Sequence, residues 1–348
     1  MHYEQLSLTP DDVELRLNPQ GDPEAPLWVI PLDRWRDAPP GRVRRMAELT
    51  ARTHRIPVGV LESGALPALE PLLRALTVTL SSAPEPKPRP YIVGCRDIGA
   101  ALRRLSGAVG ENPRASVALA GLLRQTEALD TDAGLAAEAA VYSMLLGGNE
   151  FRRWRTERPV RRMAVEERQM VRLERTDDAL AIVLDNPRRR NALSTRMRES
   201  LLEAFQVAEF DPSIARVELR GSGPAFCSGG DLDEFGIAND LVAAYLVRLE
   251  RAPWRIIHRL RSKVTAYLHG ACIGAGVEMA AFAGQVIADS DTFFRLPEIG
   301  MGLVPGAGGT VSVPQRIGRW RAAWMMLTGE PIDVETAARW GLVDRVRS

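Results

Sequence analysis

The sequence predicts a layered α/β protein, and three observations support this prediction. From about Gln169 onward, short β-like segments alternate with segments whose apolar residues recur every three or four positions. Two glycine-containing turns each follow a strand and precede a helix. The composition, with 45% apolar and 26% charged residues among 348, supplies enough core-forming material for about two folded domains.

The N-terminal half is predicted to be α/β or mainly helical. Helices are expected over Ser116–Leu129 and Leu135–Trp154, and Gly147-Gly148 is expected to break or cap the second one, with Asn149 capping a short helix after it. The second helix carries one apolar stripe, formed by Leu135, Ala139, Tyr142 and Leu146. Because the stripe has no carboxylate pair, glycine-rich loop or histidine, we interpret it as a packing face without chemistry.

Two changes in composition divide the chain. The proline-rich segment 81–90 favours an extended path and is expected to separate two sub-blocks of the N-terminal half. The charged run 152–162 precedes the alternation of strands and helices. We therefore place a domain boundary near residue 163, between domains 1–163 and 164–348.

The C-terminal half is predicted to consist of strand-to-helix units. Strands are expected at Leu180–Leu184, Val217–Leu219, Val264–Leu268 and Gln285–Ala288. Ser194 is the expected N-cap of a helix whose buried face contains Leu193, Met197, Leu201 and Phe205. A later helical stretch is expected to break at Pro253, and another helix is expected to begin at about Gly276.

Charge and cysteine content exclude several kinds of protein. Forty-five basic and forty-four acidic residues leave a net charge of +1, which provides no broad field for nucleic acid or an anionic membrane. Cys95, Cys227 and Cys272 fall at no metal-ligand spacing and are odd in number, so we expect no bound metal and a reducing, cytoplasmic location. The start, Met1 to Gln5, lacks the features of a secretory signal.

The most apolar stretch, Val264 to Ile287, has enough residues to cross a bilayer. It also contains His269, Glu278 and clusters of glycine and other small residues. We therefore expect a buried strand, loop and helix here, and no membrane partner.

The two glycine-containing turns, 224–232 and 269–279, carry the main chemical signal. Glycine lets the backbone approach a ligand closely, and a helix start leaves peptide N–H groups unpaired. Two such turns facing each other would form an oxyanion hole, in which each donor lowers a reaction barrier by about 3 kcal/mol. Either turn alone is as readily explained as an ordinary tight turn.

Taken together, residues from about 169 to 346 resemble the crotonase superfamily, and most closely its enoyl-CoA hydratases. The motifs that carry the resemblance are Asn191-Ala192-Leu193, Phe226 to Leu232, Gly274 to Glu278, Pro297-Glu298, Pro305 to Thr310 and Gly341 to Asp344. The resemblance implies a spiral of ββα turns that binds an acyl-CoA thioester and stabilises the enolate formed at its α-carbon.

The resemblance also implies roles for individual residues. The N–H groups of Gly230 and Ala275 form the oxyanion hole, Glu278 orients and deprotonates water, Glu298 acts on the α-proton, and the Gly306 N–H holds the water. Two carboxylates suit hydration because one proton leaves the water while another reaches the α-carbon. Taken singly, Glu278 is equally explained as a helix-dipole charge and Glu298 as a surface turn residue.

Coenzyme A is expected as part of the substrate, and no separate cofactor is expected. The resemblance makes Arg190 a candidate for binding a CoA phosphate, although a solvated charge is an equal alternative. Ser228 resembles a family position whose backbone carbonyl receives the adenine amino group. We interpret His269 as structural. Cys227 and Cys272 are interpreted as packing residues, because no basic neighbour is placed to activate a thiolate.

The two ends of the sequence depart from this family. Its members continue for several helices beyond the Gly-Leu-Val-Asp motif, whereas this sequence stops at Ser348. The segment 112–158 is similar in character to the missing helices. We therefore expect the N-terminal half to be a divergent, non-catalytic crotonase-like unit whose helices replace the missing cover; an independent helical adaptor domain is the alternative.

The expected function is the reversible hydration of a 2-enoyl-CoA to a 3-hydroxyacyl-CoA. An enoyl-CoA isomerase or another enolate-forming acyl-CoA lyase or hydrolase is the first alternative, and a non-catalytic acyl-CoA-binding partner subunit is the second. Resemblance to the family implies a homo-oligomer, either a trimer or a hexamer. No motif decodes the acyl-chain identity, because the expected acyl pocket lies in the motif-free segment 235–261.

Overall fold

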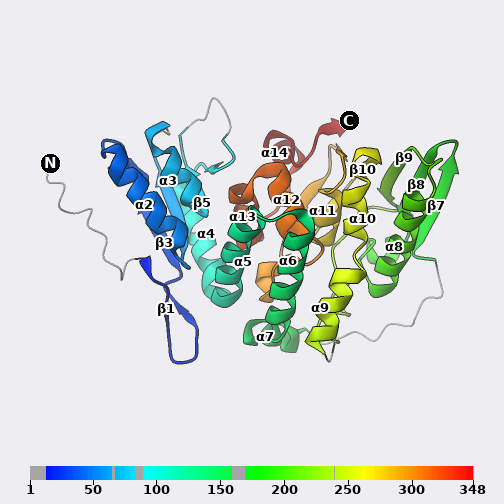
Figure 1. Ribbon diagram of the computed structural model, residues 1–348, viewed down its shortest axis with the longest axis horizontal. Coiled ribbons are helices and arrows are strands. Elements are labelled where there is room, and N and C mark those ends of the chain that lie inside the picture. The colour runs from blue at the N-terminus through cyan, green and yellow to red at the C-terminus, as the bar shows by residue number, and fades with distance from the viewer. Residues whose placement is uncertain (1–12, 65–66, 84–88, 159–168, 239, 348) are drawn as a thin grey trace.

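The computed structural model describes residues 13–64, 67–83, 89–158, 169–238 and 240–347. Sheets of mainly parallel strands lie toward both ends of the elongated molecule, and a layer of helices occupies the middle (Figure 1). The predicted α/β class is confirmed. The predicted boundary near residue 163 falls in the segment 159–168, outside the described residues.

The N-terminal end contains a four-stranded parallel sheet in the order β3-β4-β5-β6. Its strands are β3 (Leu27–Pro31), β4 (Ile56–Leu61), β5 (Val78–Ser81) and β6 (Ile92–Gly94). The connections contain η2 (Leu32–Trp35), α2 (Pro40–Arg52), η3 (Pro67–Leu69) and α3 (Glu70–Ala75), and a small antiparallel pair, β1 (Arg16–Leu17) and β2 (Pro23–Glu24), precedes them.

The proline-rich segment does not separate two sub-blocks, so this expectation was wrong. Residues 84–88 lie outside the described residues, but the strands on either side of them pair directly: Leu80 of β5 lies opposite Val93 of β6. Prolines interrupt a strand because they lack the N–H donor, yet the chain on each side of the interruption remains free to join one sheet.

Four helices follow this sheet: α4 (Ile98–Glu111), α5 (Pro113–Thr126), α6 (Thr131–Leu146) and α7 (Asn149–Glu157). The predicted break at Gly147-Gly148 is confirmed, because Gly147 is the C-cap of α6 and Gly148 the N-cap of α7. Asn149 is the first residue of α7, so its predicted capping role was wrong. Asp130 caps α6 by accepting a hydrogen bond from the Ala133 N–H at 2.8 Å.

The C-terminal half contains a six-stranded sheet in the order β15-β12-β10-β9-β8-β7, in which only β7 and β8 pair antiparallel. The strands are β7 (Val171–Thr176), β8 (Ala179–Leu184), β9 (Arg216–Gly221), β10 (Val264–Leu268), β12 (Gln285–Asp289) and β15 (Arg345–Arg347). A smaller sheet consists of β11 (Ala271–Ile273), β13 (Phe293–Arg295) and β14 (Ile332–Asp333).

The helical elements of this half are η4 (Pro187–Arg189), α8 (Thr195–Phe210), α9 (Leu241–Glu250), α10 (Pro253–Arg259), η5 (Arg261–Lys263), α11 (Ala275–Ala280), η6 (Glu298–Met301), α12 (Gly309–Ile317), α13 (Arg319–Thr328) and α14 (Val334–Trp340). The predicted cap is confirmed, because Ser194 Oγ accepts from the Met197 N–H at 3.2 Å. The predicted break at Pro253 is confirmed as the start of α10.

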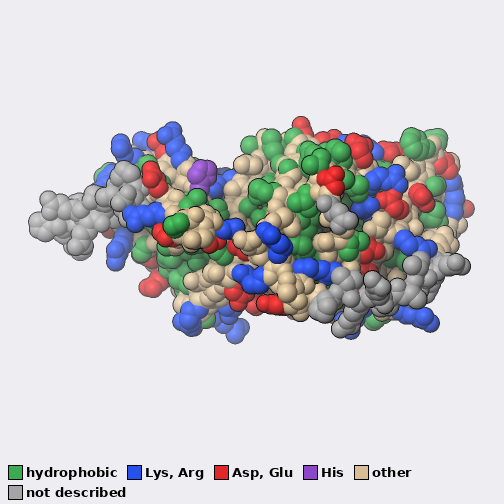
Figure 2. Space-filling model, turned by 90° about the horizontal axis from the view of Figure 1, so that it is seen from below, with side chains coloured by type: hydrophobic (Ala, Val, Ile, Leu, Met, Phe, Trp, Pro, Cys, Tyr) green, Lys and Arg blue, Asp and Glu red, His purple; other side chains and the backbone are tan. Residues whose placement is uncertain are grey.

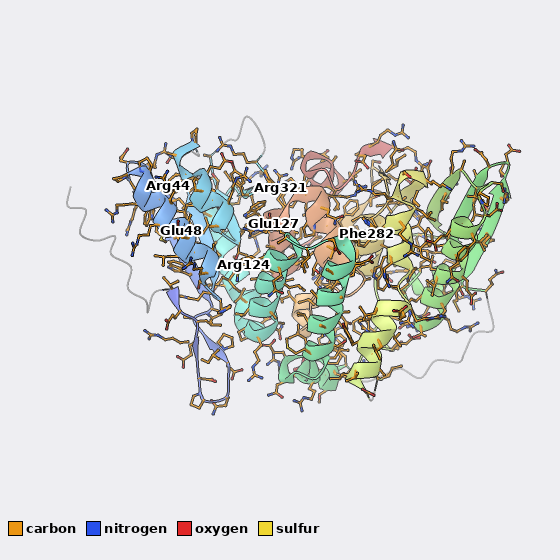
Figure 3. All side chains as sticks on the ribbon, in the orientation of Figure 1. Arg44, Glu48, Arg124, Glu127, Phe282 and Arg321 are labelled. Atoms are coloured by element: carbon orange, nitrogen blue, oxygen red, sulfur yellow. The ribbon has the colours of Figure 1, made fainter. Side chains whose placement is uncertain are left out.

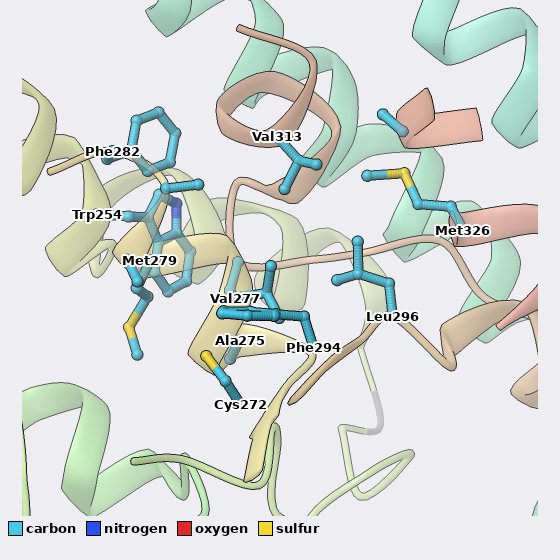
Figure 4. Close-up of a cluster of buried hydrophobic side chains, with 14 of the residues drawn as sticks. Trp254, Cys272, Ala275, Val277, Met279, Phe282, Phe294, Leu296, Val313 and Met326 are labelled. Carbon is cyan, nitrogen blue, oxygen red and sulfur yellow. The ribbon is translucent and has the colours of Figure 1, made fainter. Parts of the chain in front are cut away.

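From β10 to β13, successive strands alternate between the two sheets of this half. β10 belongs to the large sheet and β11 to the small one, and α11 follows; β12 and β13 repeat the alternation. This is the ββα repeat that the resemblance to the crotonase superfamily implies. Side chains from β11, α11, β13, α12 and α13 meet in one buried cluster around Val277 and Phe294 (Figure 4).

Helix α13 joins the two ends of the molecule. Its Arg319 pairs with Glu127 of α5 at 2.7 Å and donates a hydrogen bond to the Leu76 carbonyl at 2.9 Å. Trp320 packs edge-on against Tyr91, with the ring centroids 5.8 Å apart. In Figure 3, Glu127 lies beside this junction, between the N-terminal sheet and the central helices.

Charged side chains of both signs are interspersed on the face shown in Figure 2, as the balanced composition leads one to expect. Within the described residues, no helix combines the length and the apolar character needed to cross a membrane.

Candidate active site

A cavity of about 550 Å³ is lined by residues of α6, α8, α9 and α11 and by the loops near Gly230 and Gly306. Five residues that the sequence motifs singled out line it: Gly230, Ala275, Glu278, Glu298 and Gly306. They come from four separate segments of the chain, so the fold brings together what the sequence keeps up to 76 positions apart. Arg190 and Ser228 do not line this cavity.

The two glycine-containing turns lie side by side. Cys227 and Cys272 form an isolated parallel β-bridge, and the Ile273 N–H donates to the Cys227 carbonyl at 2.9 Å. Gly274 has a φ of +50°, and a Cβ there would lie 2.6 Å from Glu298 Oε1. This position therefore excludes side chains for both conformational and steric reasons.

Two peptide N–H groups of these turns are available to a ligand. Among the described residues, neither the Gly230 N–H nor the Ala275 N–H donates a hydrogen bond to another protein group. Ala275 begins α11, so its N–H is one of the donors that a helix start leaves unpaired. Both residues line the cavity, where their N–H groups can donate hydrogen bonds to a bound oxygen that carries negative charge.

Glu278 of α11 is only 2% exposed. Its Oε2 accepts hydrogen bonds from the Ala307 N–H at 2.7 Å and the Gly309 N–H at 2.9 Å. Burial raises the pKa of Glu278 well above its usual range, and the nearby carboxyl groups of Glu298 and Glu138 raise it further. The two N–H donors act in the opposite direction, because they stabilise the carboxylate.

Glu298, the first residue of η6, has different surroundings. Its Oε2 is buried and has no hydrogen-bond partner among the described residues. Burial raises the pKa of Glu298 to about 8, with a further rise from the charge of Glu138. Burial thus raises the pKa of both carboxyl groups, and they differ in their donors: two peptide N–H groups stabilise the carboxylate of Glu278, whereas the Oε2 of Glu298 has none.

A third buried carboxyl group, Glu138 of α6, was missed by the sequence analysis. It is 2% exposed, and it accepts hydrogen bonds from the Gly308 N–H at 2.7 Å, the Thr310 N–H at 2.8 Å and the Thr310 hydroxyl at 2.7 Å. Burial raises the pKa of Glu138 to about 7. The sequence did contain one sign of this buried group, because Glu138 lies between two alanines on a helix with an apolar stripe. The interpretation of this helix as a packing face alone was incomplete.

Four successive N–H groups, from Ala307 to Thr310, are thus held by Glu278 and Glu138 in alternation. Among the described residues, the Gly306 N–H donates to no protein group, so it remains available at the cavity wall. A Cβ at Gly306 would lie 2.4 Å from the ring of Tyr142. Glycine is required here because the aromatic ring of α6 lies directly against the backbone.

Arg190 and Ser228 adjoin each other outside the cavity. The Ser228 N–H donates to the Arg190 carbonyl at 3.0 Å, and the Ser228 hydroxyl donates to the Arg189 carbonyl at 3.3 Å. The Arg190 side chain is exposed, whereas Arg189 pairs with Asp231 at 2.5 Å and with Asp233 at 2.8 Å. Their roles toward CoA stay a prediction.

The remaining candidates have structural surroundings. His269 Nε2 lies 2.9 Å from the Gly223 carbonyl and ties two loops together. Burial raises the pKa of the Cys227 thiol to about 12 and that of the Cys272 thiol well above its usual range, which disfavours a thiolate in either. In the described ranges, no three His, Cys, Asp or Glu side chains are grouped to hold a metal ion.

One cavity is thus lined by two residues whose peptide N–H groups have no protein acceptor among the described residues and by two buried carboxyl groups, Glu278 and Glu298. Donors of this kind can stabilise negative charge on a bound oxygen. A family model described as enoyl-CoA hydratase/isomerase matches residues 174–348, half of the chain. The chain belongs to the enoyl-CoA hydratase/isomerase family.

Individual relatives cover the same share of the chain. It is 33% identical over 174 residues to the 2,3-dehydroadipyl-CoA hydratase of Escherichia coli K12, an alignment that covers 50% of this chain and 68% of that protein. It is 38% identical over 174 residues to a probable enoyl-CoA hydratase of Rhodobacter capsulatus, covering 50% and 66%. A crystal structure of enoyl-CoA hydratase from Thermoplasma volcanium aligns over 53% of this chain and 74% of that one, with 32% identity and a TM-score of 0.47.

Proposed function

We propose that the protein catalyses the reversible hydration of a 2-enoyl-CoA thioester to a 3-hydroxyacyl-CoA. The observation that carries this proposal is the pairing of Glu278 and Glu298 in one cavity with different hydrogen-bond surroundings. Hydration requires a base and an acid at neighbouring carbons, and the two N–H donors of Glu278 favour its carboxylate relative to Glu298, whose Oε2 has no such donor. The family membership and the relatives named as hydratases support the same reaction.

The N–H groups of Gly230 and Ala275 bind the thioester carbonyl oxygen in this mechanism. Attack at the β-carbon moves the electron pair of the double bond toward the carbonyl, so negative charge accumulates on that oxygen. Each aligned donor in a desolvated site stabilises this charge by about 3 kcal/mol.

Glu278 acts as the base toward water, which the Gly306 N–H helps to orient. The oxygen of water forms a bond with the β-carbon while its proton passes to Glu278. Glu298 then transfers its proton to the α-carbon, which consumes the enolate and completes the addition of one water. Proton exchange with solvent returns Glu278 to its ionised form and Glu298 to its protonated form.

The N-terminal half closes the cavity in this proposal. Tyr142 and Leu146 of α6 line the cavity wall, and Glu138 of the same helix holds the loop that follows Gly306. We propose that this helix and its neighbours within 112–158 serve as the cover that the family's terminal helices provide elsewhere.

The test is incubation of the purified protein with a panel of 2-enoyl-CoA thioesters in deuterated water, with mass spectrometry of the products. A hydratase adds one water and incorporates deuterium at the α-carbon. Glu278→Gln should abolish water addition, whereas Glu234→Gln is the matched control, because Glu234 also lines the cavity but accepts hydrogen bonds from Thr195.

Double-bond migration that persists in Glu278→Gln, without water addition by the unmodified protein, would assign an isomerase in place of a hydratase. Binding of the thioesters with neither water addition nor α-deuteration would assign a non-catalytic binding subunit.

A further inference from the structure

Helix α9 contributes a single arginine, Arg248, to the wall of the candidate active-site cavity. The same helix lines the cavity with Ala243, Ala244 and Val247, and Trp254 and Phe235 add further apolar surface. Arg248 is therefore a cation set in a mainly apolar wall of the cavity.

The other charged residues that line the cavity have protein partners. These pairs are Asp231 with Arg189 at 2.5 Å, Arg198 with Glu199 at 2.8 Å, Glu234 with the Thr195 N–H at 2.6 Å, Asp240 with the Val242 N–H at 2.8 Å, and Glu278 with the Ala307 N–H at 2.7 Å. Glu298 differs, as described above, because its Oε2 lacks a partner.

Among the described residues, Arg248 forms no ion pair with a carboxylate. Its Cζ lies 4.0 Å from the centre of the Tyr142 ring, so the guanidinium stacks on the aromatic face. Its Nε is buried and has no hydrogen-bond acceptor in the part of the chain that the structure describes. A guanidinium held flat on a ring in this way is oriented but lacks an anion.

The position of Arg248 also limits how far an anionic group bound to it can lie from the reacting carbons of a substrate. Tyr142 contacts Gly306 on one side and Arg248 on its face, so a single aromatic ring separates the proposed water site from the guanidinium. An anionic group on the substrate would therefore stand only a few carbons beyond the β-carbon.

We propose that Arg248 selects short acyl-CoA thioesters whose acyl group ends in a carboxylate, which the guanidinium binds as a fork. This inference rests on the proposed function for the orientation of the thioester. The substrate carboxylate supplies the anionic partner that the guanidinium does not have among the described residues, and a bidentate pair of this kind is among the strongest polar contacts in proteins.

The test measures binding of two unreactive saturated thioesters by calorimetry: hexanoyl-CoA and adipyl-CoA, its counterpart with a terminal carboxylate. The unmodified protein should bind adipyl-CoA at least about tenfold more tightly, as expected for a charge-assisted pair in a partly buried site. Arg248→Met should remove this preference. Arg248→Lys should retain part of it, because the charge remains but the fork is lost.

Arg198→Met is the matched control, because that arginine lines the same cavity but pairs with Glu199. It should leave the preference for adipyl-CoA unchanged. Circular dichroism of each variant establishes that it is folded before binding is compared.

Equal or tighter binding of hexanoyl-CoA by the unmodified protein overturns the proposal, as does failure to bind either thioester. A preference that survives in Arg248→Met overturns it as well; Arg248 would then act only on the charge of Glu138, whose pKa it lowers. Binding selectivity without hydration of the matching 2-enoyl thioester would instead reject the proposed reaction and leave the role of Arg248 intact.

Discussion

Glu138 and Glu278 hold the same loop through alternate peptide groups, although 140 positions separate them in the chain. Glu278 receives the N–H groups of Ala307 and Gly309, and Glu138 receives those of Gly308 and Thr310. The N-terminal half is thus bonded directly to the loop that presents Gly306 to the cavity.

Glu138→Gln should destabilise the protein and reduce turnover together. The amide would place an N–H₂ group against either the Gly308 or the Thr310 N–H, which leaves a buried donor unpaired at a cost of about 1–3 kcal/mol. Thermal unfolding and steady-state kinetics check this. Asp132→Asn on the same helix is the control, since its pair with Arg255 is exposed and should contribute less than about 1 kcal/mol. Equal effects of both substitutions would contradict the role assigned to Glu138.

Gly306→Ala should lower the turnover number, because the added methyl group would overlap the Tyr142 ring at 2.4 Å. Either the ring or the loop must move, and the loop carries the N–H that the mechanism assigns to water. Gly300→Ala serves as the control, since nothing lies within 4 Å of a Cβ there. Unchanged hydration by Gly306→Ala, measured at saturating substrate, would argue against a role for that N–H.

Stability should fall as the pH rises from about 4.5 to about 8. Burial raises the pKa of Glu298 to about 8, so the folded protein retains a proton there that the unfolded chain has released. The folded state therefore binds more protons than the unfolded state between these two pH values. The stability that Glu298 contributes is fully present below the pKa of the unfolded chain, about 4.5, and is lost as the pH rises through the pKa of the folded protein, about 8. Each retained proton changes the free energy of unfolding by about 1.4 kcal/mol per pH unit.

Glu298→Gln removes this titration, so its unfolding midpoint should depend less steeply on pH than that of the unmodified protein. Denaturant unfolding at pH 6 and pH 9 provides the comparison. Glu138 and Glu278, which also have raised pKa values, should leave a residual slope in the variant. Parallel pH profiles for the two proteins would place the Glu298 carboxyl group in water.

Arg319→Met should weaken the junction between the two ends of the molecule. The arginine is 7% exposed, and its loss leaves the Leu76 carbonyl without this donor, at a cost of about 1–3 kcal/mol. Arg347→Met is the control, because its pair with Asp289 is largely exposed. Calorimetric unfolding measures both variants, and an undiminished transition temperature in Arg319→Met would contradict this account.

The sequence motifs singled out four residues that line the cavity, because each lies in a short segment with its own local pattern. These residues are Gly230, Ala275, Glu278 and Glu298. Ser194 was predicted as a helix cap for the same reason. Glu138 could not be found in this way, since its partners lie 170 and 172 positions later and no local pattern records them. The pairing of β5 with β6 was not predicted for a related reason. The prolines indicate an extended connection, but they carry no information on whether the strands before and after it pair.

The contact between Glu138 and residues 308–310 also determines when the site can come into existence during synthesis. The ribosome completes α6 long before it reaches Gly308, so the Glu138 carboxylate remains hydrated until residues 308–310 have been made. Its dry surroundings arise only when this loop docks against α6. A nascent chain that ends before the loop therefore carries an ordinary, hydrated acid at residue 138, and the wall of the cavity is complete only after the loop has folded.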